Sequence, residues 1–224
     1  MNIAENFRAI GDRVAVAATR AGHPVRVLAV SKTQPAAAIA TLAALGQRAF
    51  GENYVQEALS KRSALGALDL EWHLIGPLQS NKAREAAAHF DWLHSLDRLK
   101  LVGALGRHRP AQAGPLQVLI QVNIDDEASK SGCHPDELGA LAAAISATSG
   151  LNLRGLMAIP APKDLARRRA AFARMRALYE RLRVEHAQVD TLSMGMSDDF
   201  ELAIAEGATL VRVGSALFGP RATA

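Results

Sequence analysis

Eight short apolar segments alternate with helix-like segments along the chain, and this alternation restricts the fold more than any other feature. Short apolar runs that end at Gly, Pro or polar residues are typical of buried strands. The predicted strands cover residues 25–32, 48–50, 70–75, 91–95, 116–123, 151–159, 191–194 and 209–213. Strands separated by helices form parallel sheets, because each helix carries the chain back to the start of the next strand.

Helix-like periodicity fills the stretches between these strands. The predicted helices cover residues 2–22, 35–45, 54–65, 80–89, 97–107, 135–149, 165–186 and 198–206. Eight such units in 224 residues predict an α/β fold, a single parallel (β/α)8 TIM barrel with an extra N-terminal helix. We expect residues 1–224 to form one domain. A doubly wound sheet is the alternative, but no G-x-G-x-x-G follows the first strand.

Composition narrows the class of protein further. Hydrophobic residues make up 49% of the chain, which is ample for a barrel core. The lone Cys133 excludes an intramolecular disulfide, and Glu5 and Arg8 stand where a signal peptide needs apolar residues. No apolar run approaches the roughly 18 residues of a membrane span. We therefore expect a cytoplasmic protein with no membrane partner.

The net charge of +4 comes largely from arginines in the predicted helix 165–186. Phe172, Met175, Tyr179 and Leu182 recur there at helical spacing, so the arginines should occupy the solvated face. A basic excess alone is a weak sign of nucleic-acid binding, and no aromatic-interleaved recognition motif accompanies it. We expect no nucleic-acid partner.

The residues that close the predicted strands should meet at one mouth, because barrel enzymes and binding proteins place their sites at the carboxyl ends of the strands. These residues are Lys32, Asn53, His73, Gly76, Ser95, Asn123, Met157, Pro160, Arg212 and the turns 193–197 and 214–215. An amine, carboxamides, an imidazole and a guanidinium would thus face one ligand.

The turns after the seventh and eighth strands indicate a phosphate site. Gly195 and Gly214 allow a close backbone approach, and Ser197 is predicted to cap a helix that starts at residue 198. Each turn alone could be an ordinary cap or tight turn. Together on adjacent strands they favour a phosphate, which barrels often bind at this position.

A phosphorylated ligand beside the strand-end amine of Lys32 suggests a Schiff base. Two chemistries fit: a sugar-phosphate aldolase, or a protein that holds pyridoxal 5'-phosphate (PLP). Arg212 favours the second, because it lies two residues before Gly214 on the same face of its strand and could reach the pyridine nitrogen. The alternatives are that Arg212 pairs with an interior carboxylate and that Lys32 simply ends its strand at the surface.

The remaining polar residues of the mouth have simpler explanations. A lone histidine on an apolar strand, such as His73, is more often a satisfied core residue than a ligand. The histidines show no metal-ligand spacing, so we expect no metal. The adjacent Asp198 and Asp199 suit the first turn of a helix better than a catalytic pair.

With these residues assigned, the chain resembles the pyridoxal phosphate homeostasis protein family, also called the proline synthase co-transcribed homologue family. The resemblance spans nearly the whole chain. Its motifs are LAVSKT at 28–33, FGENY at 50–54, WHLIGPLQSNK at 72–82, SKSG at 129–132, GLMAIP at 155–160 and SMGMSDD at 193–199. Gln34 and Leu74 depart from what many relatives carry, and Gln34 leaves no second lysine beside Lys32.

The resemblance implies a barrel like the N-terminal domain of alanine racemase. It implies that Lys32 carries PLP as an aldimine and that Arg212 faces the pyridine nitrogen. The expected cofactor-binding residues are Lys32, Asn53, His73, Gly195, Met196, Ser197, Arg212, Gly214 and Ser215. It also implies a non-catalytic role, in which the protein holds PLP and keeps its free level low, with PLP-dependent apo-enzymes as candidate partners and a monomeric state.

A PLP-dependent racemase or decarboxylase is the alternative function, and a Schiff-base aldolase is a second one. A racemase of this type needs a second base, supplied in alanine racemase by a tyrosine from an added β-domain. We expect no such domain, since the chain ends at residue 224, and Tyr54 and Tyr179 are the only tyrosines. We therefore expect a PLP carrier and not an enzyme, and we expect no catalytic residues.

Overall fold

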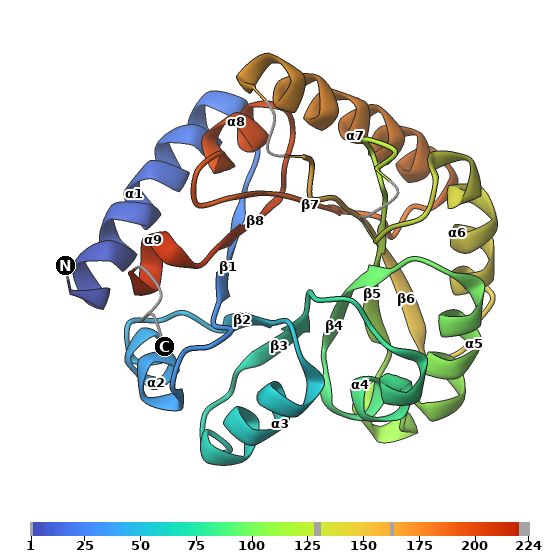
Figure 1. Cartoon of the computed structure of the whole chain (residues 1–224), viewed down its shortest axis with the longest axis horizontal. Helices are drawn as coiled ribbons and strands as arrows, with labels where there is room; N and C mark the ends of the chain where they lie inside the picture. The colour runs from blue at the N-terminus through green and yellow to red at the C-terminus, as the bar shows by residue number, and fades with distance from the viewer. Residues whose placement is uncertain (1, 128–130, 162–163, 220–224) are drawn as a thin grey trace.

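The eight strands close into one parallel barrel in the order β1-β2-β3-β4-β5-β6-β7-β8 (Figure 1). The computed structural model describes residues 2–127, 131–161 and 164–219. The strands are β1 Arg26–Val30, β2 Ala49–Glu52, β3 Glu71–Leu74, β4 Trp92–Leu96, β5 Leu116–Gln121, β6 Leu151–Met157, β7 Thr191–Met196 and β8 Leu210–Val213. The prediction of a parallel (β/α)8 barrel is confirmed.

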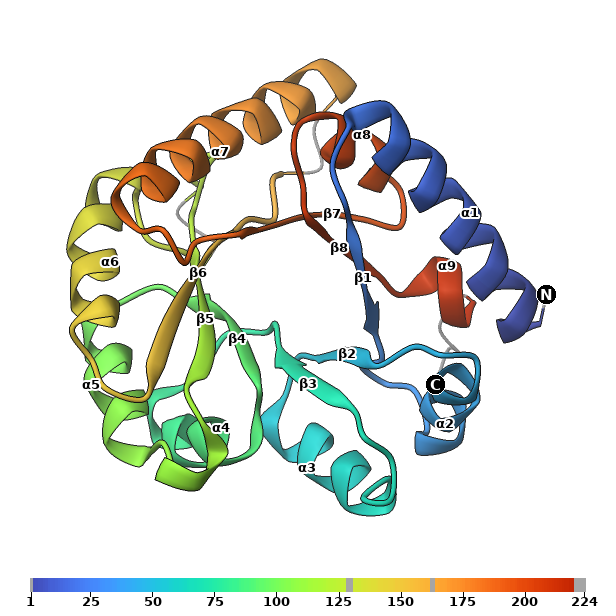
Figure 2. The ribbon, with the colours of Figure 1, turned by 180° about the vertical axis from the view of Figure 1, so that it is seen from behind.

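Helices surround the barrel as an outer ring, which both views of the ribbon show (Figures 1 and 2). They are α1 Ile3–Ala21, α2 Ala36–Ala44, α3 Val55–Ala64, α4 Ala83–His89, α5 Leu99–His108, α6 Leu138–Ser146, α7 Leu165–Glu185, α8 Phe200–Ala205 and α9 Ser215–Phe218. Short 3-10 turns occur at η1 Ser80–Lys82, η2 Ala111–Ala113 and η3 Pro135–Glu137. The sequence did not predict α9.

The extra N-terminal helix α1 has a complete cap at each end. Asn2 accepts a hydrogen bond from the backbone of Ala4, and Glu5 accepts one from Asn2 in return. Gly22 ends the helix at φ +75°, a left-handed conformation that glycine adopts without a Cβ penalty. Between the caps, Ile10 and Val14 are buried, so α1 covers the barrel beside α8 and α9 (Figure 1).

The polar surface of α7 explains the concentration of arginines. Arg169 pairs with Glu206, which directly follows α8, Arg174 with Asp125 and Arg176 with Glu180. These guanidinium groups lie on the solvated side, while the apolar stripe of α7 packs inward. In the described part of the chain, no helix is both long and apolar enough to cross a membrane.

Polar side chains enter the barrel interior at several levels, which an apolar strand pattern alone does not predict. His73, His94 and Ser193 are fully buried, and Arg212 is 3% exposed. The ring of Trp92 packs against both His73 and His94. The described residues contain no group of three or more His, Cys, Asp or Glu side chains placed to hold a metal ion.

Candidate cofactor site

A cavity of about 300 Å³ opens at the carboxyl ends of the strands. This is the lower end of the size range for small-molecule sites, about 300–1,000 Å³. Most of the predicted site residues line it, namely Lys32, Asn53, Met196, Ser197, Arg212, Gly214 and Ser215. Asp198 and the apolar side chains Val30, Ile75 and Ile159 complete much of the wall. Strand alternation could have predicted two of these apolar residues. Val30 lies two residues before Lys32 and Ile75 two residues after His73, so each pair faces the same side of its strand.

His73 does not line this cavity, and its expected place at the mouth needs correction. Side chains alternate along β3, so Ile75 reaches the cavity and His73 lies one level deeper in the barrel. Its ring is fully buried, with Nδ1 2.8 Å from Nε2 of His94 and Nε2 2.5 Å from Oε1 of Glu71. Both ring nitrogens are hydrogen-bonded, so His73 is a satisfied core histidine, the alternative to a ligand-binding role.

Gly195 also lies behind the cavity wall rather than in it. Its φ is +88°, and a Cβ there would come within 2.5 Å of the Cβ of Ala203 on α8. Only glycine therefore lets the end of β7 approach this helix. Gly214 lines the cavity, and a Cβ on it would lie 3.3 Å from Val30 of β1.

Ser197 connects the two turns, although it does not cap α8 as predicted. The helix begins at Phe200, after Asp199, whose carboxylate accepts the Met196 backbone N–H at 2.7 Å. The Ser197 hydroxyl instead accepts the backbone N–H groups of Gly214 and Ala216, each at 3.3 Å. Polar groups from the loops after β7 and β8 thus meet at one point of the wall.

Arg212 supplies a buried positive charge to the cavity. Its guanidinium donates to the Ser193 carbonyl at 2.9 Å, to the Ser193 hydroxyl at 2.8 Å and to the Ala158 carbonyl at 2.9 Å. Among the described residues no carboxylate forms a direct ion pair with it, although the charge of Asp199 acts on it from farther away, which argues against the interior ion pair considered for Arg212. Burial lowers the pKa of Arg212 to about 10, so the group is still charged at neutral pH.

A buried ion-pair cluster stands behind Lys32; we call Glu52, Glu57 and Lys61 the lysine-side cluster. Lys61 of α3 donates to Glu52 Oε1 at 2.8 Å and to Glu57 Oε1 at 2.6 Å. It also donates to the carbonyl of Ser31 at 2.7 Å. Burial is the main cause of a raised pKa at Glu52, whose second carboxyl oxygen has no hydrogen-bond partner.

The lysine-side cluster fixes the backbone on both sides of Lys32. The Ser31 hydroxyl donates to Glu52 at 2.6 Å, and the Thr33 backbone N–H donates to Glu57 at 2.5 Å. Thr33 has φ +65°, a left-handed conformation that side chains with a branched Cβ rarely adopt. The cluster therefore holds a strained turn and the half-buried Lys32 in one position.

These groups suit an anionic ligand that carries a carbonyl. Lys32 offers an amine, Arg212 a permanent charge, and Ser197 and Ser215 hydroxyls close to glycine-containing turns. The residues therefore fit a phosphorylated carbonyl compound in donor type, charge and cavity size. Of the family motifs, Ser129–Lys130 lies outside the described residues.

Comparison with known proteins identifies the family. Residues 6–222 match the family described as alanine racemase, N-terminal domain. The pyridoxal phosphate homeostasis protein of Pseudomonas aeruginosa is 55% identical over 98% of this chain and 96% of its own length. That of Escherichia coli K12 is 52% identical over 98% of this chain and 97% of its own length.

Solved structures agree with this assignment. PipY of Synechococcus elongatus, solved without PLP, superposes with a TM-score of 0.89 at 41% identity, covering 97% of this chain and 100% of PipY. PipY with PLP bound gives 0.86 at 40% identity, with the same coverage. D-threonine aldolase of Filomicrobium marinum, at 20% identity and a TM-score of 0.79, shares the fold. By fold, sequence and motif, this chain belongs to the pyridoxal phosphate homeostasis protein family.

Proposed function

We propose that this protein binds PLP, holds it as a Schiff base on Lys32 and takes part in PLP homeostasis without catalytic turnover. One observation carries the proposal: Lys32, Arg212 and the joined Ser197 and Gly214 turns line a single cavity. The family supports it, since relatives above 50% identity are named for PLP homeostasis and PipY has been solved with PLP. We also propose that residues 1–224 form one PLP-binding barrel domain.

Each part of the ligand has a matching group in the proposed site. Bound PLP supplies an aldehyde, which condenses with an amine with loss of water, and an electron-withdrawing pyridine ring. Lys32 would provide the amine, and Arg212 would face the ring nitrogen. Ser197, Gly214 and Ser215 would receive the phosphate, with Met196 and Asn53 on the flanking walls. His73 and Gly195 would act from behind the wall and not by contact.

Low turnover follows from two features of the cavity wall. Arg212 only donates hydrogen bonds, so a ring nitrogen that faces it stays unprotonated and the ring withdraws electrons weakly. No tyrosine or histidine is present among the described residues that line the cavity. Tyr54 is 67% exposed outside it, and Tyr179 lies in the outer layer on α7. The wall thus lacks a second base of the kind that a racemase requires.

Turnover can be measured by incubating the PLP-loaded protein with L-alanine in deuterated water. We expect α-carbon deuterium exchange and D-isomer formation at or below the level given by free PLP. Exchange well above that level, and abolished in Lys32→Ala, would instead establish a racemase or a related enzyme. Binding of PLP with background exchange supports the carrier function.

The phosphate assignment can be tested at Ser215, which is exposed at the cavity edge. Ser215→Asp would place a negative charge against the phosphate, whereas Ser215→Ala removes only a hydroxyl. We expect Ser215→Asp to lose PLP during dialysis much faster than Ser215→Ala. Equal retention by the two variants would place the phosphate elsewhere.

We propose a cytoplasmic monomer that passes PLP to apo-enzymes, supported by the homeostasis names of its relatives. Mixing the loaded protein with a PLP-dependent apo-enzyme should restore that enzyme faster than dissociation of PLP into buffer allows. Restoration at the dissociation rate would mean that transfer proceeds through free PLP.

A further inference from the structure

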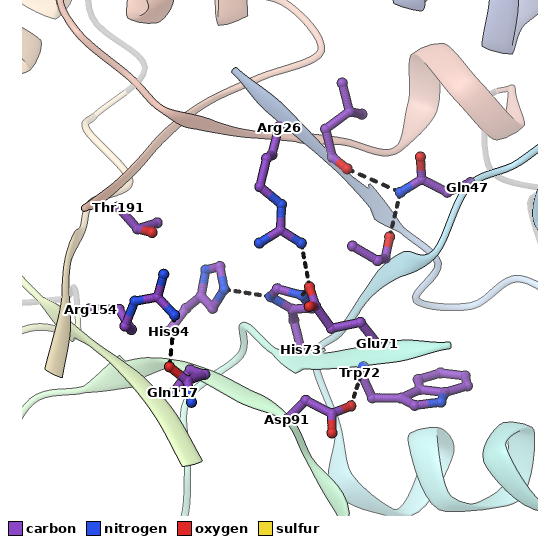
Figure 3. Close-up of polar contacts among 12 residues, drawn as sticks. Arg26, Gln47, Glu71, Trp72, His73, Asp91, His94, Gln117, Arg154 and Thr191 are labelled. Atoms are coloured by element: carbon purple, nitrogen blue, oxygen red, sulfur yellow. Dashed lines mark hydrogen bonds and ion pairs between the residues drawn. The ribbon is translucent and has the colours of Figure 1, made fainter. Parts of the chain in front are cut away.

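A hydrogen-bonded chain crosses the interior of the barrel from Arg212 to Glu71, and we call it the trans-barrel chain. Arg212 lies 2.8 Å from the Ser193 hydroxyl, and that hydroxyl lies 3.2 Å from Nδ1 of His94. The chain continues from His94 to His73 at 2.8 Å and from His73 to Glu71 at 2.5 Å, and Figure 3 shows these three side chains beside one another. The chain thus connects the cavity wall to the first residue of β3.

The two ends of the trans-barrel chain determine its direction. A guanidinium can only donate and an ionised carboxylate can only accept, so with both imidazoles neutral every link runs from Arg212 toward Glu71. Ser193 therefore accepts from Arg212 and donates to Nδ1 of His94. His94 then donates from Nε2 to Nδ1 of His73, which in turn donates from Nε2 to Glu71. In this arrangement both histidines are neutral and carry their proton on Nε2.

Burial and charge support this protonation state. Burial lowers the pKa of His73, and it lowers the pKa of His94 further, with the positive charges of Arg212 and Arg26 acting in the same direction. At Glu71 burial opposes ionisation, but the hydrogen bonds from His73 and from Arg26, 2.5 Å away, and the charge of Arg26 hold its pKa below the usual range. The carboxylate is thus charged and the imidazoles are not.

Aromatic packing against Trp92 helps to fix the orientations of both imidazole rings. The Trp92 ring is stacked on His73, with ring centroids 5.3 Å apart and 8° between the planes. Against His94 it packs edge-on at 6.1 Å. Since His73 and His94 are fully buried, no water competes for their ring nitrogens.

We propose that Ser193, His94 and His73 are positioning residues that orient the Arg212 guanidinium at the cavity wall, with Glu71 as their anchor at the opposite end of the barrel. The chain is not a proton conduit to the cavity, because Arg212 cannot accept a proton at that end. It orients a donor, and it links a buried cation that has no direct ion pair to the Glu71 carboxylate through polarised neutral groups. The consequence for ligand retention rests on the proposed PLP function.

The first test needs no ligand. Long-range ¹H–¹⁵N correlation spectra of histidine-labelled protein distinguish the two neutral tautomers from the cation. At pH 7 we expect Nε2–H tautomers at both His73 and His94. In Glu71→Leu the anchor is lost, and the signal of His73 should move toward a tautomer mixture, whereas Glu71→Gln, which keeps an acceptor, should preserve the wild-type pattern. An Nδ1–H tautomer or a charged ring at either position in the wild type would overturn the proposal.

The second test measures PLP retention in a double-variant cycle. Ser193→Ala breaks the link next to Arg212 and should weaken PLP binding roughly tenfold. Thr191→Val is the matched control, since Thr191 lies on the same strand and face but bonds to Asp190 instead of the chain. Adding His94→Leu to Ser193→Ala should cost little more, because the link is already broken.

The outcomes separate the two proposals. A wild-type protein that fails to bind PLP would contradict the proposed function. The tautomer measurement would still test whether the hydrogen bonds of the trans-barrel chain run as proposed. Normal PLP binding by Ser193→Ala, or equal losses in Ser193→Ala and Thr191→Val, would contradict the positioning role alone. Independent, additive losses from Ser193→Ala and His94→Leu would also contradict it.

Discussion

Two buried cations, Lys61 and Arg212, lie beside the cavity, and they are linked to carboxylates in different ways. Lys61, behind Lys32, contacts the carboxylates of both Glu52 and Glu57. Arg212 contacts only uncharged oxygens. The charge of Asp199 acts on it from farther away, and its hydrogen-bonded link to Glu71 runs through Ser193 and two imidazoles. The lysine side of the site is therefore held by direct ion pairs, and the arginine side by a relay of neutral groups.

The difference follows from where each cation lies. The lysine-side cluster is placed between the barrel and the outer ring, where α3 presents Glu57 and Lys61 one turn apart toward Glu52. In the barrel interior only strand side chains are present, and each strand offers every second residue. A direct carboxylate would also cancel the charge that Arg212 presents to a ligand. The relay leaves the charge of Arg212 available to a ligand in the cavity. The ion pairs of the lysine-side cluster instead fix the backbone on both sides of Lys32.

The largest effect should come from breaking the lysine side. Lys61→Met leaves Glu52 buried without its cation, and we expect unfolding free energy to fall by about 3–5 kcal/mol. Urea denaturation measures this loss. The double variant Glu52→Gln with Lys61→Met removes both charges and should recover most of it. A loss below about 1 kcal/mol in Lys61→Met would show that its ion pairs behave like exposed ones.

Acid should change the free energy of unfolding in opposite directions through the arginine side and the lysine side. The pKa of His94 is lowered in the folded state, so its stabilisation is complete above the unfolded pKa near 6.5 and declines as pH falls below it. The expected slope is about 1.4 kcal/mol per pH unit for each histidine that stays neutral. The pKa of Glu52 is raised, so its contribution to stability is present at low pH and lost as pH rises through the folded pKa.

Urea denaturation between pH 7 and pH 5 separates these contributions. His94→Gln should flatten the loss of stability in acid, and Glu52→Gln should steepen it, each compared with the wild type. The positive charges that act on His94 are those of Arg26 and Arg212, and they are unchanged in both variants, as is its hydrogen-bond partner His73. The same slope in all three proteins would contradict the assignment of neutral and charged groups.

The smallest effect should come from Arg26, at the far end of the arginine side. Its guanidinium contacts Glu71 at 2.5 Å but is half exposed, so Arg26→Gln should cost at most about 1 kcal/mol. The histidine tautomers should not change, because Glu71 still accepts from His73. A loss comparable to that of Lys61→Met would mean that Arg26, and not the chain of imidazoles, carries the stability of this side.

The sequence predicts the barrel and most of the cavity wall, because strand ends and glycine turns are local features. It does not predict the contact between His73 and His94, which depends on the register of β3 against β4. The Ser197 prediction fails for a related reason: its hydroxyl binds N–H groups of the neighbouring β8 turn rather than those of its own helix. Alternation does mark Glu52 as facing α3, but only the fold supplies Lys61 as its partner.

The central claim is that PLP is bound covalently at Lys32. The most direct measurement is borohydride reduction of the PLP-loaded protein, followed by peptide mass mapping. We expect one pyridoxyl group on Lys32, and none on Lys61, whose amine is occupied by two carboxylates. A visible band that disappears on reduction should accompany it, and Lys32→Ala should show neither. A loaded protein with no reducible adduct, or with the adduct on another lysine, would contradict the account.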